Sequence, residues 1–405
     1  MTQRPLCVLL VAGHPVQYSS PSFRLYAKDP RLDILVAYCG LQGAESHLDQ
    51  EFGVEVKWDI PLLQGYPWIA IKNRSWCPGL GSFFGLFNPG IWSLIRREKF
   101  DAVVLYTGYV YATFWIALVA ARISGAAVLF GTDAHALSSR DNQGWKSTVK
   151  KLLWPRLFRL ADVVILPSSG GSALMRSLGI GEERLALTPY CVDNDWWIME
   201  SSRVDREVVR RRWDVPKEAP VVLFCAKLQP WKRPQDVLRA FVRAGLPNSY
   251  LVFAGDGALR SALESEVRSL KISDRVRFLG FVNQSQLPET YTASDVFVLA
   301  SEYEPFGVVV NESMLCGCPV IVSDRVGAKF DLVREDETGF VFPMGDVGAL
   351  SELLHQVLQS PERLKRISES ARKRMASWSP PQNLEGLITA LERATQLRRL
   401  DADRP

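Results

Sequence analysis

The sequence has no long apolar run. None of its hydrophobic stretches approaches the roughly 18 residues that a membrane-spanning helix needs, and the nearest, residues 109–121, is predicted to be a buried helix. Residues 6–11 are apolar, but this run is short and is followed by Gly13-His14-Pro15, which is typical of a first buried strand and not of a secretory leader. We therefore expect neither a spanning helix nor a signal peptide.

Paired cysteines and a strong charge of one sign are also missing. The 405 residues include seven cysteines, none of them in a C-x-x-C pair, so the sequence predicts no zinc site and no disulfide framework. Cys316 and Cys318 are predicted to pack as small apolar side chains. A reduced, cytoplasmic compartment is the simplest fit. The net charge of only +4 argues against a protein that binds nucleic acid in bulk.

The chain is too long for one ordinary core, and two domains are expected. Apolar, strand-like runs alternate with helical patterns in both halves, which is the signature of an α/β protein with parallel sheets. In the second half, these runs predict a doubly wound unit that binds ligands where its strands end. The predicted strands are residues 6–11, 34–38, 102–105, 127–130, 163–166, 219–224, 249–254, 275–278, 296–299, 320–322 and 339–341.

Two glutamates with seven residues between them organise the second half, Glu304 and Glu312. Pro305 favours a helix that starts just after it, with Glu304 in the preceding loop and Glu312 about two turns in, roughly 10–12 Å away. This exceeds the roughly 5–9.5 Å between the paired carboxylates of a glycosidase. It suits the two ends of one long polar ligand with phosphate at the helix N-terminus, as in a nucleotide sugar. The alternative is a surface helix with two solvated glutamates.

A second polar cluster follows the first predicted strand of the second half. Lys227 and Lys232 are five residues apart on a loop at a strand's carboxyl end, where two cations can hold a diphosphate. Two solvated surface lysines are the alternative.

The segment around the two glutamates resembles the E-x7-E motif of the family-4 retaining glycosyltransferases, which have the GT-B fold. Residues 314–323 resemble that family's A-x-A-x-G-x-P-V-I-x-S strand entry. Residues 226–233 resemble its G-R-L-x-x-x-K-G motif, with alanine, lysine and arginine in place of the first glycine, the arginine and the last glycine. Residues 188–193 match its P-N-G-V-D turn in part, with tyrosine and cysteine in place of asparagine and glycine.

The resemblance implies two Rossmann-like, doubly wound domains that face each other across a cleft. It places an acceptor-side domain at residues 1–198 and a nucleotide-sugar-binding domain at residues 215–378, with a polar linker between them. A final helix within residues 380–405 is expected to cross back and pack on the first domain, and Pro380-Pro381 is predicted to interrupt the helices at this point.

The resemblance also assigns roles in binding a nucleotide-diphospho-sugar donor. Lys227 and Lys232 are implied to stabilise the diphosphate, Glu304 to position sugar hydroxyls, and Glu312 to hold the ribose. Nothing in the sequence distinguishes one nucleobase from another. The other positions expected to bind the donor are His14, Gly257, Phe281, Val282, Phe306, Gly307 and Val308.

Three polar residues of the first half are candidates on the opposite side of the cleft. Asp133 and His135 follow a predicted buried strand, where the family often has an aspartate or histidine that faces the transferred sugar, so both are catalytic candidates together with Glu304. A structural histidine is the alternative for His135. His14 stands in an H-P-x-Q-Y opening, where many members have a glycine pair next to the donor phosphates, and it is expected to replace that contact.

Two segments of the first half have two interpretations each. Residues 42–88 are rich in glycine, proline and aromatic residues without a clear period, and form either an acceptor-side wall or a loop packed on its own domain. Residues 146–160 mix five basic residues with apolar ones, and either lie on an anionic membrane surface or form a domain helix with a solvated basic face.

The sequence thus predicts a retaining glycosyltransferase that moves a sugar from a nucleotide-diphospho-sugar to a glycan or lipid-linked acceptor in polysaccharide or glycoconjugate biosynthesis. No D-x-D motif stands in the expected place, so we expect neither a metal ion nor a cofactor. The predicted setting is cytoplasmic, with peripheral membrane contact as an open alternative. Two other functions also stay open: an epimerase or hydrolase of the same fold that acts on nucleotide sugars, and a non-catalytic nucleotide-sugar-binding subunit.

Overall fold

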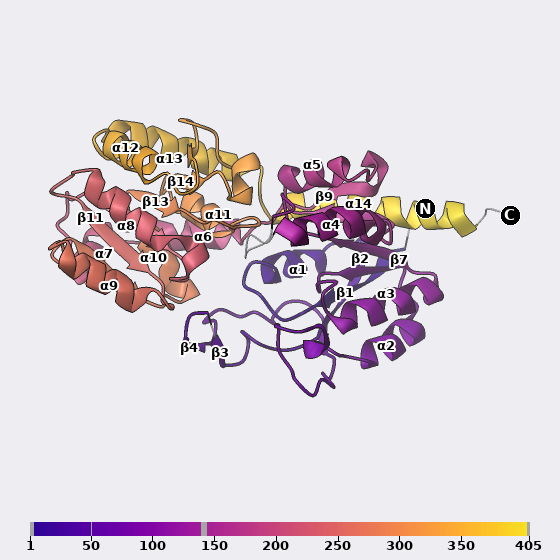
Figure 1. Cartoon of the computed structure of the whole chain (residues 1–405). Helices are drawn as coiled ribbons and strands as arrows, with labels where there is room; N and C mark the ends of the chain where they lie inside the picture. Colours follow the sequence, from indigo (N-terminus) through magenta and orange to yellow (C-terminus); the bar gives the residue numbers. More distant parts are fainter. Residues whose placement is uncertain (1–3, 50, 139–143, 403–405) are drawn as a thin grey trace.

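The computed structural model of the chain describes residues 4–49, 51–138 and 144–402, and it shows two α/β domains side by side (Figure 1). Each domain is built on one parallel sheet, in agreement with the predicted pair of Rossmann-like domains. Among the described residues, no helix is both long and apolar enough to cross a bilayer.

The first domain has a seven-stranded parallel sheet in the order β5-β2-β1-β6-β7-β8-β9. All five predicted strands appear. β5 and β9 were not predicted, because three-residue strands at the two edges of a sheet are too short to show a period. The strands are β1 (Leu6–Ala12), β2 (Leu32–Tyr38), β5 (Trp68–Ala70), β6 (Ala102–Leu105), β7 (Ala127–Gly131), β8 (Val163–Leu166) and β9 (Leu185–Leu187), and the helices are α1 (Ser20–Tyr26), α2 (Gly90–Glu98), α3 (Ala112–Ser124), α4 (Gly144–Phe158) and α5 (Ser169–Ser177).

The second domain has a six-stranded parallel sheet in the order β12-β11-β10-β13-β14-β15, and its strands are the six that the sequence predicted. The strands are β10 (Val221–Cys225), β11 (Tyr250–Ala254), β12 (Val276–Gly280), β13 (Val296–Leu299), β14 (Val320–Ser323) and β15 (Gly339–Phe342). The helices from the linker onward are α6 (Asn194–Ser202), α7 (Arg206–Arg212), α8 (Pro234–Arg243), α9 (Arg260–Ser269), α10 (Leu287–Thr292), α11 (Val309–Leu315), α12 (Val347–Leu358), α13 (Pro361–Met375) and α14 (Pro380–Ala402).

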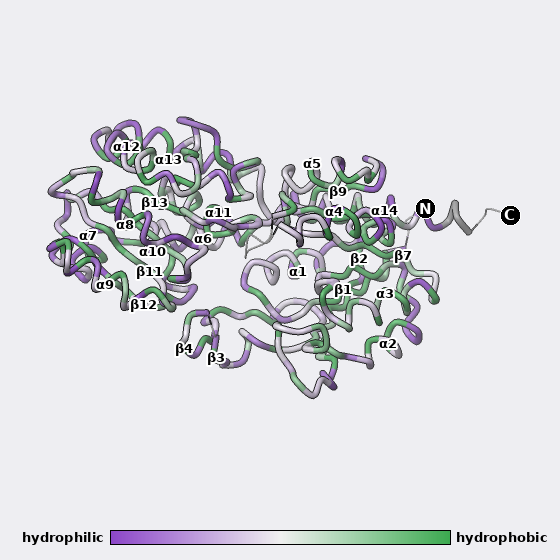
Figure 2. Tube along the Cα trace, viewed as in Figure 1, coloured by the Kyte–Doolittle hydropathy of each residue, from purple (hydrophilic) through white to green (hydrophobic). Residues whose placement is uncertain are grey.

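Both sheets are covered on both faces, which explains why their strands are apolar at successive positions. Leu223 packs in one core cluster and its neighbours Val222 and Phe224 in another, on the opposite face of the sheet. Figure 2 shows the same contrast, with hydrophobic strands inside and hydrophilic stretches on the outer helices.

The helix that carries Glu312 begins later than predicted. Pro305 does not start it, because Gly307, with a φ of 93°, first turns the backbone through the left-handed region, and α11 begins at Val309. Glu312 therefore lies in the first turn of the helix and not two turns in. Glu304 precedes the helix, as predicted.

Two segments cross between the domains and bind each other there. The carbonyl oxygen of Tyr190 accepts hydrogen bonds from Asn311 Nδ2 at 3.0 Å and from Trp378 Nε1 at 2.8 Å. Asn383 Nδ2 donates to the carbonyl oxygen of Pro189 at 2.8 Å. These bonds connect both crossing segments to α11.

The last helix packs on the first domain, where it contacts α1 and strands β7 to β9. Pro380 and Pro381 are the first two residues of α14, so they start this helix as well as separating it from α13. The predicted end of the segment, residues 403–405, lies outside the described residues. At the other crossing, α6 includes residues up to 198 that were assigned to the first domain, but it packs on α10 and α11 of the second.

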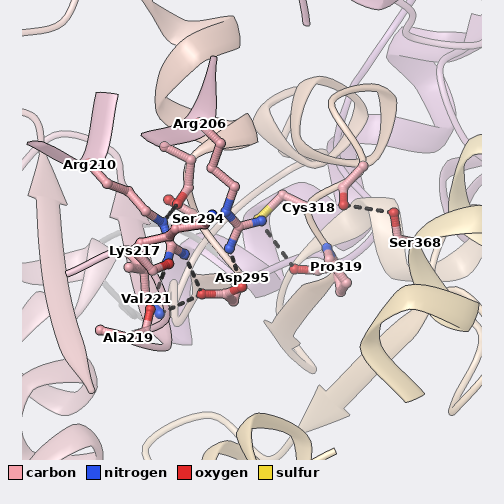
Figure 3. A network of polar contacts seen from close by, with 12 residues as sticks. Arg206, Arg210, Lys217, Ala219, Val221, Ser294, Asp295, Cys318, Pro319 and Ser368 are labelled. Carbon is pink, nitrogen blue, oxygen red and sulfur yellow. Dashed lines mark hydrogen bonds and ion pairs between the residues drawn. The ribbon is translucent and has the colours of Figure 1, made fainter. Parts of the chain in front are cut away.

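A charged network fastens α7 to the amino edge of the second sheet (Figure 3). Asp295, just before β13, pairs with Arg206 and with Arg210 Nη2 at 2.7 Å, and accepts a hydrogen bond from Val221 N at 2.7 Å. Arg210 is only 2% exposed, and it also donates to the carbonyl oxygens of Ala293 and Ala219, both at 2.9 Å. Every charge in the core of this network therefore has a partner within one domain.

A small antiparallel hairpin extends from the first domain toward the second (Figure 1). Its strands are β3 (His47–Asp49) and β4 (Val54–Val56). It belongs to the segment 42–88, for which no secondary structure was predicted. We call residues 47–49 and 51–59 the docking hairpin, because they contact the carboxyl edge of the second sheet.

Candidate active site

A cavity of about 480 Å³ lies between the domains, at the carboxyl ends of the second sheet's strands, and we call it the cleft. Loops after β10 to β13 and the start of α11 line one side, and the docking hairpin and the loops after β1 and β7 line the other. The predicted site residues that line the cleft are Asp133, Lys227, Lys232, Phe281, Val282, Glu304, Phe306, Gly307, Val308 and Glu312.

Lys232 and Glu304 form an ion pair on the wall of the cleft. Both side chains are largely buried, at 18% and 14% exposed, and Ser301 Oγ donates to the same carboxylate oxygen of Glu304 at 3.4 Å. The sequence predicted one of these residues for the diphosphate and the other for sugar hydroxyls. In this structure each neutralises the other within the second domain.

Lys227 is neutralised from the other domain. Its Nζ donates to the two carboxylate oxygens of Asp49 at 3.1 and 2.9 Å and to Glu51 Oε2 at 3.0 Å, and it lies 4.7 Å from the centre of the Phe52 ring. Burial raises the pKa of Asp49, but the hydrogen bonds from Lys227 and from two backbone amides outweigh it, and the pKa lies below its usual value. Nothing in the sequence indicated these partners.

Glu312 is a buried acid at the start of α11, with 4% of its surface exposed. Tyr291 Oη donates to its Oε2 at 3.1 Å. Burial raises the pKa of Glu312 to about 7, against the opposing effect of the hydrogen bonds from Tyr291 and Gln284. Gln284, 3% exposed, also lines the cleft, and its Oε1 has no hydrogen-bond partner. These two side chains offer acceptor oxygens to a ligand in the cleft.

Asp133 reaches the cleft from the loop after β7, and it is partly buried. Burial raises the pKa of Asp133, a backbone hydrogen bond opposes this, and the negative charge of Glu304 raises it further. Asp133 also lines a second cavity of about 340 Å³ in the first domain, which is rich in aromatic rings, among them Tyr106, Tyr109 and Trp154. The two cavities share Asp133, Tyr190 and Tyr303.

His135 does not line the cleft. Its Nδ1 lies 3.1 Å from the carbonyl oxygen of Pro305, and its ring is 5.4 Å from that of Phe330, so it contacts the second domain beside the loop that holds Glu304. Burial lowers the pKa of His135. Its predicted role at the transferred sugar stays a prediction, and its position in this structure is that of an interdomain contact.

His14 lies in a neighbouring cavity of about 220 Å³ in the first domain, together with Gly13, Tyr18 and Tyr190. Burial lowers the pKa of His14. The predicted contact with the donor phosphates is not tested by this position.

Gly257 lies beside the cleft and not on its wall, and its backbone conformation explains the residue type. Its φ is 149°, and a Cβ there would come within 2.8 Å of the carbonyl oxygen of Leu228 and 3.1 Å of that of Glu51. Phe306 is fixed by packing, because its ring stacks on Trp378 at 6.3 Å and meets Tyr190 edge-on at 5.6 Å.

Sequence reasoning missed several residues that line the cleft, Asp49, Glu51, Phe52, Trp58 and Gln284, and also Tyr291, which donates to Glu312. The first four lie in the segment 42–88, whose length and composition were interpreted as either an acceptor-side wall or a loop packed on its own domain. Within the described residues, no group of three His, Cys, Asp or Glu side chains is arranged to hold a metal ion.

Two family models match the chain, one in each domain. Residues 22–191 match the model described as "Glycosyl transferase 4-like domain". Residues 205–374 match the model described as "Glycosyl transferases group 1". Together the two matches cover most of the chain.

Curated relatives align with parts of the chain. It is 30% identical over 170 residues to N-acetyl-alpha-D-glucosaminyl L-malate synthase of Bacillus anthracis, covering 42% of this chain and 44% of that protein. It is 33% identical over 221 residues to D-inositol 3-phosphate glycosyltransferase 2 of Catenulispora acidiphila, covering 51% of each. The chain thus spans about half the length of the curated relatives it matches.

Solved structures share the whole two-domain architecture. HepE of Anabaena in complex with UDP superposes with a TM-score of 0.73 at 19% identity, covering 96% of this chain and 99% of that one. A glycosyltransferase of Rickettsia africae superposes with a TM-score of 0.71 at 16% identity, covering 97% and 99%. At these identities the likeness shows the fold alone. By its two family matches and its fold, the chain belongs to the glycosyltransferases of the GT-B type.

Proposed function

We propose that this chain transfers a sugar from a nucleoside-diphosphate sugar to an acceptor hydroxyl, and that the cleft is its active site. The observation that carries the proposal is the set of groups that meet there: Lys227 and Lys232 from one loop, the buried Glu312, and the amide oxygen of Gln284 without a hydrogen-bond partner. Two cations suit a diphosphate, and buried acceptor oxygens suit the hydroxyl and N–H donors of a nucleoside.

The proposed reaction breaks the bond between the anomeric carbon and the diphosphate, and the two lysines stabilise the charge that develops on the leaving group. Because both lysines pair with carboxylates, donor binding exchanges a carboxylate for a phosphate at each of them. At Lys232 this exchange frees Glu304 to accept hydrogen bonds from sugar hydroxyls. Glu312, within the same cavity, accepts a hydrogen bond from the ribose.

We propose that no divalent ion takes part, because the two lysines supply the positive charge that a metal would provide. Transfer measured in excess EDTA is expected to match transfer in Mg²⁺. A loss of activity in EDTA that Mg²⁺ or Mn²⁺ restores would contradict this part of the proposal.

Retention of the anomeric configuration is also proposed, and it rests on the E-x7-E resemblance. In a front-face reaction the acceptor hydroxyl passes its proton to the leaving phosphate, whereas an inverting reaction needs a general base on the acceptor side. Asp133 is the carboxylate in position to be such a base. Proton NMR of the fresh product is expected to show the donor's anomeric configuration, and the opposite anomer would assign Asp133 the role of base.

The donor is tested by thermal shift with uridine, guanosine, adenosine and thymidine diphospho-sugars. A hundredfold excess over its dissociation constant should add about 2.7 kcal/mol to the free energy of unfolding. HepE binds UDP and UDP-glucose in solved structures, which makes the uridine compounds the first to try. If none of the four raises the melting temperature, the proposed donor site is wrong.

The products separate transfer from the two other functions. We expect a glycosylated acceptor and a free nucleoside diphosphate. Free sugar without an acceptor would indicate a hydrolase, and a changed sugar still bound to the nucleotide would indicate an epimerase. If Glu304→Ala leaves glycan assembly in cells unchanged, the chain is a non-catalytic subunit.

For the acceptor we propose a sugar or polyol hydroxyl, on a glycan or a lipid-linked precursor, in the aromatic cavity of the first domain. Tyr109 and Trp154 line this cavity with aromatic side chains, and Asp133 lies where the cavity joins the cleft. The names of two relatives mention D-inositol 3-phosphate and L-malate, which carry hydroxyl groups. Trp154→Ala is expected to raise the KM of the acceptor and leave that of the donor unchanged.

We also propose that α4 contacts an anionic membrane surface. Its outer face carries Trp145, Val149, Leu152 and Leu153 at helical spacing, and three of these are 56–62% exposed. Lysines and arginines flank this face. The wild-type protein is expected to sediment with phosphatidylglycerol vesicles. The L152S/L153S variant is expected to stay in the supernatant.

The matched control is Leu270→Ser, which removes an exposed leucine from the second domain. Wild-type protein that stays in the supernatant with anionic vesicles would overturn the membrane contact and leave α4 as a domain helix.

A further inference from the structure

The docking hairpin contacts three neighbouring loops of the second domain, at positions that the sequence assigned to the donor. Asp49 and Glu51 bind Lys227 after β10, the backbone of Glu51 passes close to Gly257 after β11, and Phe52 packs on Phe281 after β12. Since β12, β11 and β10 are adjacent in the sheet, the hairpin lies across half of its carboxyl edge.

At Lys227 the hairpin satisfies the whole ammonium group. The ammonium has three hydrogens to donate, and its three acceptors are the two oxygens of Asp49 and one of Glu51, all within 3.1 Å. Two carboxylates on one lysine carry the same total charge as the diphosphate of a nucleotide sugar. A phosphate oxygen that binds Lys227 must therefore displace at least one of them.

At Phe281 the hairpin supplies an aromatic ring. The rings of Phe52 and Phe281 are 5.0 Å apart and meet edge to face, and Trp58 lies 6.0 Å from Phe281. The side chain of Gln229 also donates to the carbonyl oxygen of Glu51. The tip of the hairpin thus presents two carboxylates and an aromatic ring to the second domain. A nucleoside diphosphate carries comparable groups, a charged diphosphate and an aromatic base.

The base of the hairpin is held by separate contacts outside the cleft. Asn283 Nδ2 donates to the carbonyl oxygen of Lys57 at 2.8 Å, and Ser285 N donates to Asp59 Oδ1 at 3.1 Å. Neither Asn283 nor Ser285 lines the cleft. The contacts at the base are therefore compatible with a tip that leaves Lys227.

We propose that the docking hairpin is an internal competitor of the donor: Asp49, Glu51 and Phe52 occupy the diphosphate and base positions, and a nucleoside diphosphate binds by displacing them. This inference rests on the proposed function, because it takes the cleft to be the donor site. It predicts a resting enzyme whose first domain partly closes its own donor site, so that donor affinity is set by the strength of the hairpin's ion pairs.

The test compares the binding of UDP, GDP, ADP, dTDP and inorganic pyrophosphate by calorimetry in the wild type and in a D49N/E51Q variant. The amides keep the size of the side chains, and the amide oxygen introduced at position 49 can still accept the backbone hydrogen bonds that Asp49 accepts. We expect the nucleotide that binds the wild type to bind the variant about fivefold more tightly, the effect of removing two partly exposed ion pairs. Phe52→Ala should tighten nucleoside diphosphates but not pyrophosphate.

The control is Glu55→Gln, which removes the same charge from the same hairpin at a residue that bonds to Ser46 and not to the second domain. It should leave affinity unchanged. In hydrogen exchange on the wild type, the nucleoside diphosphate that binds should increase exchange of the backbone amides of Val54 to Val56.

If D49N/E51Q binds the nucleotide with equal or lower affinity, and hydrogen exchange in the hairpin is unchanged, the hairpin does not compete with the donor. This result would not contradict the proposed donor site. If no nucleoside diphosphate and no pyrophosphate binds the wild type or any variant, the proposed donor site fails and the competitor fails with it.

Discussion

The two edges of the second domain's sheet both gather charge, and they use it differently. At the amino edge, Asp295 pairs with Arg206 and Arg210, and backbone carbonyls of the same domain complete the network. At the carboxyl edge, Lys227 takes its counter-charges from the other domain, and Lys232 takes its own from a loop in the cleft. The first arrangement lies within one domain, whereas we propose that the second is exchanged for a ligand's charges.

The difference teaches that a satisfied charge is not by itself a structural one. The charges named at the two edges all have partners, so pairing alone does not reveal which edge binds a ligand. The position of the partner does, because the partners at the carboxyl edge lie on the hairpin and the loop that surround a cavity. Three variants test this comparison.

The largest effect is expected at the amino edge. Arg210→Ala removes a buried guanidinium and leaves Asp295 without its buried partner, which should lower the free energy of unfolding by about 3–5 kcal/mol. Urea denaturation measures this. The affinity of the folded variant for nucleotide should not change, because Arg210 lies at the opposite edge from the cleft. A weaker nucleotide affinity in the folded Arg210→Ala variant would contradict the comparison.

At the carboxyl edge, Lys232→Ala should have the reverse effect. It removes a cation that we propose to stabilise the leaving diphosphate, and kcat/KM for transfer should fall about 100-fold, or about 2.7 kcal/mol. Stability should change less than in Arg210→Ala. Lys232→Arg, which keeps the charge, should retain more activity than the alanine variant. Unchanged transfer by Lys232→Ala would show that this pair is structural too.

Glu312 should make stability depend on pH. Its pKa in the folded protein is raised to about 7 by burial, above the ordinary value of 4.5, so the folded state holds a proton that the unfolded state loses. The free energy of unfolding therefore falls as pH rises from about 4.5 to about 7 and stays lower above that. Glu312→Gln removes this cost and should be more stable than the wild type by about 3 kcal/mol at pH 8, with little difference at pH 4.5.

Urea denaturation at the two pH values measures this, with the exposed Glu352→Gln as the control. The same pH dependence in the wild type and in Glu312→Gln would show that another group is responsible. Because ribose hydroxyls donate to the ionised carboxylate, nucleotide affinity should also drop in Glu312→Gln at pH 8.

Local signals in the sequence predicted most of the second domain. Its six strands are continuous apolar runs between turns. Because the strands are parallel, the residues that follow them lie at one edge of the sheet. Lys227, Lys232, Glu304 and Glu312 were therefore expected to meet. The predicted start of α11 was wrong because it was based on Pro305 and did not take the left-handed turn at Gly307 into account. A turn of that kind depends on contacts that a local pattern does not contain.

The first domain's share of the cleft was not predicted, and the reason is physical. Asp49 and Lys227 are 178 residues apart in the chain, and no period or spacing relates them. The hairpin has strands of three residues each, which are too short to show alternation. His135 was selected as a polar residue at a strand end, but which way such a side chain turns is decided by the neighbouring domain.

The most direct test of the account is a crystal structure of the protein with a nucleoside diphosphate bound. We predict that the diphosphate lies between Lys227 and Lys232, that the ribose contacts Glu312, and that Asp49 and Glu51 have left Lys227. A nucleotide bound outside the cleft, with both lysines still paired to their carboxylates, would contradict it.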